Sequence, residues 1–442
     1  MDISREQGND RLTGLLDRWQ LLERMRAVLA GPAAPRRCAV FCLDLDDFRD
    51  TNVTLGYPFG DRLLIAVADR LRRRLGPRDL LSRFGADDFV LFRADVADEA
   101  AAAAWAHDLL ASLDETYDIS GLAVRCTASV GYVVWDGRGP ALDPDVAVAR
   151  GELALHAAKA RGDSRSMPFR PAMEQDRRDH LALTKDMRDG LGTDQFFLVY
   201  QPRVALEDGR MTGVEALVRW RHPTRGLLSP ATFIPLAEHS GLIRPLGEWI
   251  LAEACRQAAR WRRAGVAVGT MAVNVAPVQL EDPRALDRSV AAALDESGLP
   301  PQALELELTE SALIDLRDEQ ADLLRALHAR GVSIAIDDFG TGYSSLQYLR
   351  TLPIDRLKVA REFVVGVAGS RTDAVIVRAL AGLCRDLGVT ILCEGVETAE
   401  QRALLLQLDC QEAQGYLFAR PLPPDGIAAF PGAVGGGPGR PR

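Results

Sequence analysis

The sequence predicts an α/β protein with an N-terminal α+β or α/β sandwich domain followed by a TIM-like (β/α)8 barrel. Three observations carry this prediction. The chain has 442 residues, which exceeds one ordinary domain. Its second half alternates strand-like and helix-like segments at intervals of roughly 30–40 residues, as parallel βα units do. The strand candidates of that half end in polar, oxygen-bearing side chains, which is typical of the active rim of a βα barrel.

The composition bounds the class of protein. A hydrophobic fraction of 47% is enough for large buried cores. No apolar run approaches the ~20 residues that cross a bilayer, and the N-terminus is polar, so we expect a cytoplasmic protein without a transmembrane segment. The seven cysteines have no metal-ligand spacing and predict reduced, mostly buried thiols. A net charge of −9 argues against a binder of nucleic acid polymers, which needs a basic face.

Residues 1–170 are predicted to form the first domain. Two apolar runs flank the short segment Gly85–Asp88, which is a β-hairpin signal. The expected strands are Cys38–Leu45, Leu80–Phe84, Phe89–Phe92 and Leu122–Val134, and the expected helices are Leu15–Leu29, Leu63–Leu75, Glu99–Leu113 and Val146–Ala160.

The motifs of residues 10–166 resemble those of the GGDEF, or diguanylate cyclase, domain. They read DRLTGLLDR, DLDDFRDTN, GYPFGD, RFGADDF, SVGY and ALHAAKARGDSR. The resemblance implies Mg²⁺-dependent condensation of two GTP into cyclic di-GMP. It also implies roles for individual residues: Asp44 and Asp87 for the metal, Asn52 and Asp61 for guanine, and Lys159 for phosphate.

The signature departs from the family at two positions. Ala86 stands where the family has its second glycine, and Asp88 where it has glutamate. Glycine would supply room for nucleotide phosphate and any positive φ, so the Ala86 methyl should intrude. We therefore expect no synthesis of cyclic di-GMP, while GTP binding stays open because the guanine-contacting residues are present. Alternatively, Asp87 and Asp88 form only a polar hairpin tip.

A polar helical connector is expected over residues 171–185, followed by the second domain over 186–430 and a disordered Gly/Pro-rich tail over 431–442. Eight strands over about 240 residues fit a closed barrel. The candidates are Phe196–Val204, Gly213–Trp220, Met271–Val275, Leu304–Leu308, Val332–Ile336, Arg356–Val359, Val389–Cys393 and Gly415–Phe418.

The segment IAIDDFGTGYSS (334–345) is the most informative stretch of the barrel. A buried strand delivers Asp337 and Asp338 to its carboxyl end, an arrangement that holds hard cations through oxygen. An Asp-rich turn or helix cap is the alternative. The other strand ends favour the metal, because their polar residues should meet on one rim as a metal and phosphate site. They are Gln201, Glu215, Arg219, Asn274, Glu307, Glu310, Lys358, Glu394, Glu397 and Gln414.

The segment from about Leu181 to Pro424 resembles the EAL domain, a cyclic di-GMP phosphodiesterase with a barrel fold. Its motifs read YQPRV, EALVRW, FIPLAE, NVAPVQL, ELTES, DDFGTGYSSL, EGVET and QGYLFARPL. The resemblance implies a two-metal site whose ligands are Glu215, Asn274, Glu307, Asp337, Asp338 and Glu394. It further implies that Lys358 holds the attacking water or the phosphate, that Arg219 and Gln201 contact substrate, that Glu310 steadies the loop after Asp338, and that Gln414 supports a ligand.

Oxygen ligands of this kind suit Mg²⁺ or Mn²⁺, and two such ions can activate water and stabilise both oxygens of a displacement. The implied reaction is hydrolysis of cyclic di-GMP to pGpG. The family's Lys-x-Asp motif, however, reads Lys358-Val359-Ala360 here. Strand periodicity would put residues 358 and 360 on one face, so a carboxylate near the metals is missing, and we expect Glu362 to lie past the strand end.

Three interpretations stay open. The first is an active phosphodiesterase regulated by an inactive GGDEF domain. The second is a receptor that binds cyclic di-GMP through the barrel without hydrolysis and acts through a protein partner. The third is a scaffold or a still-active cyclase. The resemblance also implies pairing of two chains through the EAL domain.

Overall fold

The structure is a computed structural model that describes residues 9–137, 142–162, 164–314, 316–340 and 346–431. It contains two compact units that divide between His180 and Leu181, within helix α6 (Pro171–Gly190). The loop residues 341–345 and the tail from residue 432 lie outside the described residues, so the predicted disorder of the tail is not addressed. No described helix is both long and apolar enough to cross a bilayer.

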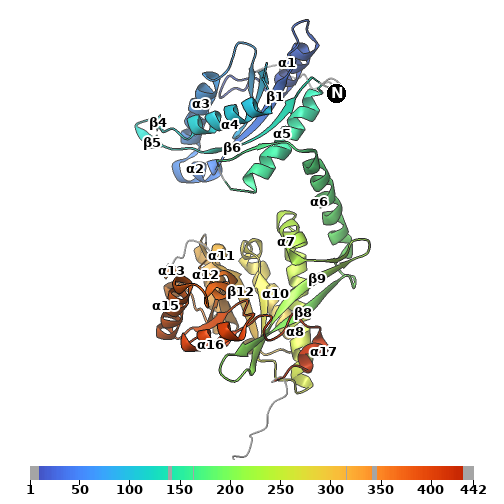
Figure 1. Cartoon of the computed structure of the whole chain (residues 1–442), viewed down its shortest axis with the longest axis vertical. Helices are drawn as coiled ribbons and strands as arrows, with labels where there is room; N and C mark the ends of the chain where they lie inside the picture. The colour runs from blue at the N-terminus through green and yellow to red at the C-terminus, as the bar shows by residue number, and fades with distance from the viewer. Residues whose placement is uncertain (1–8, 138–141, 163, 315, 341–345, 432–442) are drawn as a thin grey trace, which may run out of the picture. The chain divides into compact units, whose positions relative to one another are not determined.

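The N-terminal unit is built on a mixed sheet with the strand order β2-β3-β1-β6-β7, of which β1 and β6 are labelled in Figure 1. The central strand β1 pairs antiparallel with β3 and β6, and only the short β7 runs parallel to its neighbour β6. The strands of the unit are β1 (Cys38–Leu45), β2 (Leu80–Arg83), β3 (Asp88–Ala94), β4 (Tyr117–Ile119), β5 (Leu122–Val124), β6 (Ala128–Trp135) and β7 (Ser166–Pro168).

Helices cover both faces of this sheet. Leucine and alanine side chains of α3 and α4 pack on the face that carries Phe41 and Leu91, and those of α1 and α5 pack on the face that carries Val40 and Phe92. The predicted sandwich is thereby confirmed. The helices are α1 (Arg18–Ala30), α2 (Phe48–Leu55), α3 (Tyr57–Arg72), α4 (Glu99–Leu113) and α5 (Pro144–Lys159). The single strand expected over Leu122–Val134 is wrong, because β5 pairs with β4 in a separate hairpin before β6 begins.

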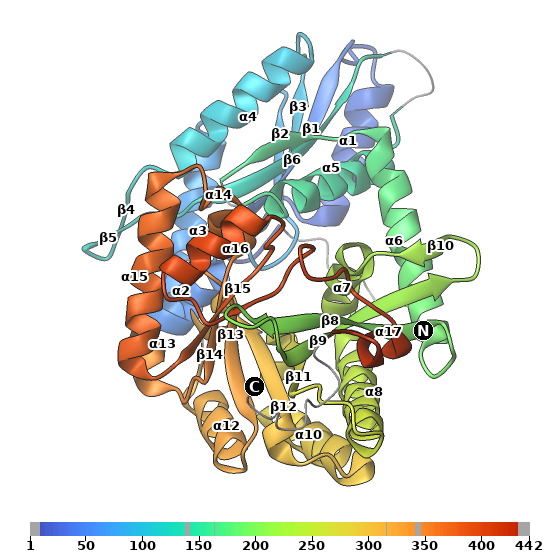
Figure 2. The ribbon, with the colours of Figure 1, turned by 60° about the horizontal axis from the view of Figure 1, so that its bottom comes forward.

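The second unit is a closed barrel. Within the described residues, eight strands follow the order β9-β11-β12-β13-β14-β15-β16-β8, and pairing of β8 with β9 closes the ring (Figure 2). The strands are β8 (Phe196–Ala205), β9 (Met211–His222), β11 (Thr270–Val275), β12 (Leu304–Thr309), β13 (Ser333–Phe339), β14 (Arg356–Val359), β15 (Thr390–Cys393) and β16 (Glu412–Ala413), with β10 (Gly226–Leu228) added beside β9.

Helices follow most of the strands and bury their apolar faces against the outside of the ring. The longer ones are α7 (Pro230–His239), α8 (Ile243–Arg263), α10 (Pro283–Ser297), α12 (Asp318–Ala329), α15 (Arg371–Leu387) and α16 (Ala399–Gln407). Shorter ones lie in the connections: α9 (Pro277–Leu280), α11 (Glu310–Ile314), α13 (Leu346–Thr351), α14 (Arg361–Gly366) and α17 (Pro424–Ala428).

Two expectations about the barrel strands are wrong. The sheet is not wholly parallel, because β8 runs antiparallel to both of its neighbours, β9 and β16. The last strand is not Gly415–Phe418 but Glu412–Ala413. Residues 415–418 form a turn in which Gly415 O accepts hydrogen bonds from Phe418 N and Ala419 N. Gly415 has a φ of 157° and lies against the Val396 backbone, where a Cβ would come within 2.2 Å of Val396 O.

The side-chain alternation of β12 shows what fills the barrel. Leu304, Leu306 and Leu308 belong to the apolar core, while the carboxylates of Glu305 and Glu307 point the other way and are also buried. Glu307 contacts side chains from β8 and β14, neither of which borders β12 in the ring. The interior of the barrel is therefore ionic, with charges that must be paired to be tolerated.

Candidate functional site

The centre of the candidate site is Lys358 on β14, whose side chain is fully buried. Its Nζ lies 2.8 Å from Glu307 Oε2, 2.8 Å from Glu394 Oε1 and 3.0 Å from Asp337 Oδ1. A fourth carboxylate oxygen, Oε2 of Glu215, is 3.6 Å away. Strands β9, β12, β13 and β14, with the residue after β15, thus bring five of the predicted site residues together.

Two amide side chains complete this cluster. Asn274 Nδ2 donates to Glu215 Oε1 at 2.8 Å. Gln414 Nε2 lies 2.8 Å from Glu215 Oε2 and 2.9 Å from Glu394 Oε1, so it bridges two carboxylates. These two contacts are consistent with the predicted role of Gln414 as a support for a ligand. Its Oε1 is buried and has no hydrogen-bond partner among the described residues, which leaves one acceptor in the site unused.

The paired aspartates lie at the end of β13. Asp337, Asp338 and Glu394 can place one oxygen each within 4.8 Å of one another, a spacing that a single cation can bridge. Asp338 has a φ of 52°, a left-handed conformation that asparagine and aspartate tolerate better than most residues. Glu310 Oε2 accepts a hydrogen bond from Gly340 N at 2.8 Å, so Glu310 does hold the described start of the loop after Asp338.

The electrostatics of the cluster follow from one ammonium among four carboxylates. Burial and the neighbouring carboxylates raise the pKa of Glu307 and of Glu394 to about 8, although Lys358 acts against the shift. Burial alone would lower the pKa of Lys358, but its four carboxylate neighbours raise it well above the usual value. Burial also opposes ionisation of Glu215, yet Lys358 and the two amide donors lower its pKa. Negative charge is in excess here.

This donor set fits divalent cations that prefer oxygen. The carboxylates of Glu215, Glu307, Asp337 and Glu394 face a single ammonium, and Asp338 adds a further carboxylate at the rim. Additional positive charge would relieve their repulsion, and among the described residues no thiol or imidazole is part of the cluster. The unused oxygen of Gln414 is a further neutral donor. Carboxylate and amide oxygens of this kind suit Mg²⁺ or Mn²⁺.

The two residues predicted to contact substrate lie beside the cluster. Gln201 is in register with Glu215 across the antiparallel β8–β9 pair, so it is a mid-strand residue and not, as expected, at a carboxyl end. Arg219 lies four residues after Glu215 on β9, where Nη1 donates to Val218 O at 2.8 Å and burial lowers its pKa. Glu397 pairs with Arg361 on the surface and is not part of the cluster.

The position of the missing carboxylate differs from the expectation. Strand β14 ends at Val359, and the fully buried Ala360 is the N-cap residue of α14, without a side-chain capping bond. Residue 360 thus lies one place past the strand that the periodicity argument used, although its backbone stays extended, with φ −55° and ψ 145°. Glu362 lies past the strand end, as predicted, and is exposed in the first turn of α14.

An ionic layer that was not predicted from the sequence lies beside the cluster inside the barrel. Arg203 and Arg356 both pair with Glu305, and Arg356 also reaches Glu412 at 3.1 Å. The available signal was the alternation LELELT, which places Glu305 and Glu307 on one face of an otherwise apolar strand. Their arginine partners come from strands that only barrel closure brings near.

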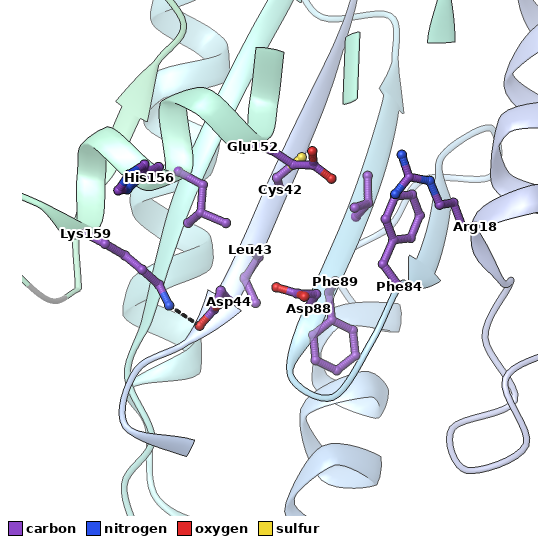
Figure 3. A pocket seen from close by; sticks show the side chains of 12 residues that line it. Arg18, Cys42, Leu43, Asp44, Phe84, Asp88, Phe89, Glu152, His156 and Lys159 are labelled. Carbon is purple, nitrogen blue, oxygen red and sulfur yellow. Dashed lines mark ion pairs between the residues drawn. The ribbon is translucent and has the colours of Figure 1, made fainter. Parts of the chain in front are cut away.

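The N-terminal unit has its own acidic cluster, which lines a cavity of about 370 Å³ (Figure 3). Lys159 on α5 forms an ion pair with Asp44 at the end of β1. Burial and the nearby Asp44 and Asp87 raise the pKa of Asp88 to about 6, and burial with Asp44 raises the pKa of Asp87. The structure thus brings together four of the six residues predicted for a GTP site.

The other two predicted residues lie around the α2–α3 junction. Asn52 is on α2 and Asp61 on α3, and the helices are separated by Gly56, which has a φ of 86°. Gly60 makes room for Asn52, because a Cβ there would lie 1.9 Å from Asn52 Oδ1. Within the described part of the chain, no hydrogen bond or ion pair joins the side chains of these two residues to the Asp44 cluster.

The hairpin tip takes an ordinary backbone conformation. Neither Gly85 nor Ala86 has a positive φ, so a conformational need for glycine at residue 86 does not arise. Arg83 fixes the tip by donating to Ala86 O at 2.7 and 3.2 Å and by pairing with Asp10 at 2.9 Å. The expectation that the Ala86 methyl group takes up space needed by nucleotide phosphate is separate from this and stays a prediction.

Fold and sites together define a two-domain α/β protein in which a carboxylate-rich barrel site follows a sheet domain with an aspartate cluster. Residues 184–421 match the EAL domain family, and residues 8–165 match the family "Diguanylate cyclase, GGDEF domain". The chain therefore belongs to the family of GGDEF–EAL tandem proteins, as its motifs predicted.

Several relatives extend over nearly the whole chain. It is 40% identical over 422 residues to "Bifunctional diguanylate cyclase/cyclic di-GMP phosphodiesterase MucR" of Pseudomonas aeruginosa, covering 95% of this chain and 61% of the relative. It is 39% identical over 433 residues to "Cyclic di-GMP phosphodiesterase NbdA" of the same organism, covering 95% and 53%. The chain thus spans about half to two thirds of the length of these relatives.

A solved structure described as "PaMucR Phosphodiesterase, c-di-GMP complex" resembles the barrel. It matches with a TM-score of 0.54 and 46% sequence identity and covers 56% of this chain and 99% of that one.

Proposed function

We propose that the chain hydrolyses cyclic di-GMP to pGpG at the barrel site, with two Mg²⁺ or Mn²⁺ as cofactors. The observation that carries this proposal is the cluster of Glu215, Glu307, Asp337 and Glu394 around Lys358. Such a cluster attracts divalent cations, and bound cations would stabilise the negative charge of a phosphodiester. The names of MucR and NbdA, both phosphodiesterases, and the complex of the related barrel with c-di-GMP support the choice of substrate.

When bound, the divalent ions would lower the pKa of a water molecule and stabilise the attacking and leaving oxygens. Glu215, Asn274, Glu307, Asp337, Asp338 and Glu394 would hold them. Gln414 orients Glu215 and Glu394, since one amide reaches both. Gln201 on β8 and Arg219 on β9, the strand that carries Glu215, would bind the dinucleotide.

Lys358 has three N–H donors, and three carboxylate oxygens lie within 3.0 Å of Nζ. Three carboxylate oxygens therefore surround its three donors, and one of them, Glu307 Oε2, accepts a hydrogen bond. A donor becomes available for a water molecule or a phosphate oxygen only when a carboxylate turns to another cation. This couples the proposed role of Lys358 to occupation of the site.

The test is incubation of the purified chain with cyclic di-GMP and Mn²⁺, with pGpG as the readout. Turnover that is lost in Glu215→Ala supports hydrolysis at this site. Asp322→Ala is the matched control, because Asp322 is an exposed partner of Arg325 on the outer helix α12 and should leave turnover unchanged. A wild-type chain that produces no pGpG contradicts the proposal.

A second candidate is a receptor that binds cyclic di-GMP without hydrolysing it. The buried Ala360, where the family has an aspartate, favours this alternative. Loss of one carboxylate beside a metal site can cost ~10–100-fold in metal affinity or activity. Binding of cyclic di-GMP without turnover in the same experiment selects the receptor.

For the N-terminal domain we propose a regulatory role without synthesis of cyclic di-GMP. Three features support this regulatory role. Asp44 is paired with Lys159, Asp88 is one methylene shorter than the family's glutamate, and Ala86 adds a methyl group where the family has glycine. MucR is named as bifunctional, so active synthesis is the competing proposal. Four further expectations stay predictions: GTP binding at Asn52 and Asp61, pairing of two chains through the barrel, a protein partner, and a cytoplasmic location.

A further inference from the structure

Arg203 on β8 is fully buried and reaches two carboxylates of β12 with one nitrogen. Its Nη1 pairs with Glu305 and lies 3.3 Å from Glu307 Oε1, while its Nη2 donates to Thr270 Oγ1 at 2.6 Å. Gly213 permits this approach, because a Cβ there would lie 2.5 Å from Arg203 Nη2. The guanidinium is thus fixed from three sides.

The two oxygens of Glu307 consequently have different partners. Oε1 faces Arg203, and Oε2 faces Lys358 Nζ at 2.8 Å, on the side of the carboxylate cluster. A planar guanidinium held by other residues resists rotation of the carboxylate that it contacts. Only Oε2 of Glu307, on the side of Lys358, is then available to bind a cation.

We propose that Arg203 is a positioning residue that keeps Glu307 a one-oxygen ligand and thereby selects small octahedral cations over Ca²⁺. Mg²⁺ requires near-ideal octahedral geometry, whereas Ca²⁺ accepts more oxygens and carboxylates that bind through both of them. Release of Oε1 would let Glu307 offer both oxygens. The inference rests on the proposed function only in taking Glu307 as a cation ligand; it does not require hydrolysis.

Arg356 provides a matched control in the same ionic layer. It also pairs with Glu305 and is nearly as buried as Arg203, but its other partner is Glu412 and not Glu307. Arg203→Lys and Arg356→Lys each retain the charge and remove the forked geometry of the guanidinium. A general loosening of the barrel would affect both variants, whereas the proposed role belongs to Arg203 alone.

The experiment measures cation binding without substrate. The metal-free full chain is loaded with Mn²⁺, and its displacement by Mg²⁺ and by Ca²⁺ is followed through the electron paramagnetic resonance signal of free Mn²⁺. We expect Arg203→Lys to raise the affinity for Ca²⁺ relative to Mg²⁺ about tenfold, the scale of effects on metal sites from residues behind the ligands. We expect Arg356→Lys to keep the wild-type ratio.

Equal ratios in Arg203→Lys and the wild type, or equal shifts in both lysine variants, would overturn the inference. So would a wild-type chain that binds none of the three cations. If Arg203→Lys does not fold, the charge-balanced Arg203→Met/Glu305→Gln variant replaces it with the same expected shift. A shifted ratio in a chain that makes no pGpG would support this inference and count against the proposed function.

Discussion

Glu310 Oε2 and Gly340 N are joined by a 2.8 Å hydrogen bond that ties the start of α11 to the residue two places after Asp338. Glu310 is buried, and its other oxygen has no hydrogen-bond partner in the described part of the chain. Asp338 has a left-handed backbone, which few non-glycine residues adopt. By holding Gly340, the bond restrains the backbone just after Asp338 and so helps to keep the paired aspartates in place.

We expect Glu310→Ala to lower the rate of pGpG formation by about 10–100-fold, the usual cost of losing a residue that orients metal ligands. Glu310→Gln keeps an acceptor oxygen for Gly340 and should retain most of the activity. Initial rates measured over a range of Mn²⁺ concentrations test this, since the alanine variant should also need more Mn²⁺. Equal rates in the two variants would show that the bond has no role.

Lys358 offers a test of the charge balance in the cluster. Lys358→Met removes the buried ammonium that four carboxylates share, and breaking a buried ion pair from one side costs about 3–5 kcal/mol. We expect a lower melting temperature in EDTA and no turnover. Because added Mn²⁺ replaces the lost positive charge, it should raise the melting temperature of Lys358→Met more than that of the wild type. Thermal unfolding with and without Mn²⁺ gives the comparison, and equal shifts in the two proteins would contradict it.

The sequence predicts structure that local patterns decide better than structure that depends on closure of the barrel. Cys38–Leu45 and Glu99–Leu113 are predicted with their observed bounds, because a mostly apolar run and a series of strong helix formers decide them locally. The bounds predicted for Arg356–Val359 also match, and that strand alternates charged and apolar residues. The direction of β8 has no such signal, since period-two alternation is the same in parallel and antiparallel strands.

The same limit applies to the site. The carboxylates, Lys358 and Asn274 could be predicted, because they follow or lie within recognisable strands and the family motifs mark them. Gln414 could be predicted from its family motif alone, because the strand before it was not recognised. The contacts of Arg203 with Glu305 and Glu307 could not be predicted, because they cross the barrel. In sequence, Arg203 is 102 residues from Glu305 and 104 residues from Glu307. Only the closed ring defines which buried charges meet.

The N-terminal domain is expected to make no cyclic di-GMP from GTP and Mg²⁺. Its Asp44 is already paired with Lys159, and the Asp88 carboxylate is one methylene shorter than that of the family's glutamate. The assay detects the cyclic dinucleotide in a Glu215→Ala background, so that hydrolysis by the barrel cannot remove the product. Product formed there would contradict the regulatory role, and its loss in Asp44→Ala would assign the synthesis to this cluster.

Ala360 gives the sharpest test of the barrel's competence. It is the N-cap residue of α14, with φ −55° and ψ 145°, next to the strand that carries Lys358. We expect Ala360→Asp to raise the rate of pGpG formation by about 10–100-fold, by returning a carboxylate to the rim of the site. An aspartate there could also cap α14, which stabilises a helix by about 1 kcal/mol.

Ala360→Asn separates these two effects, because asparagine caps a helix as well as aspartate but adds no charge. Both variants should gain similar thermal stability, and only Ala360→Asp should turn over faster, with a lower Mn²⁺ requirement. Equal rates in Ala360→Asp and the wild type would mean that a carboxylate at this position does not limit hydrolysis. Because the N-cap lies at the end of β14, two residues from Lys358, such a result would place the limitation elsewhere in the cluster.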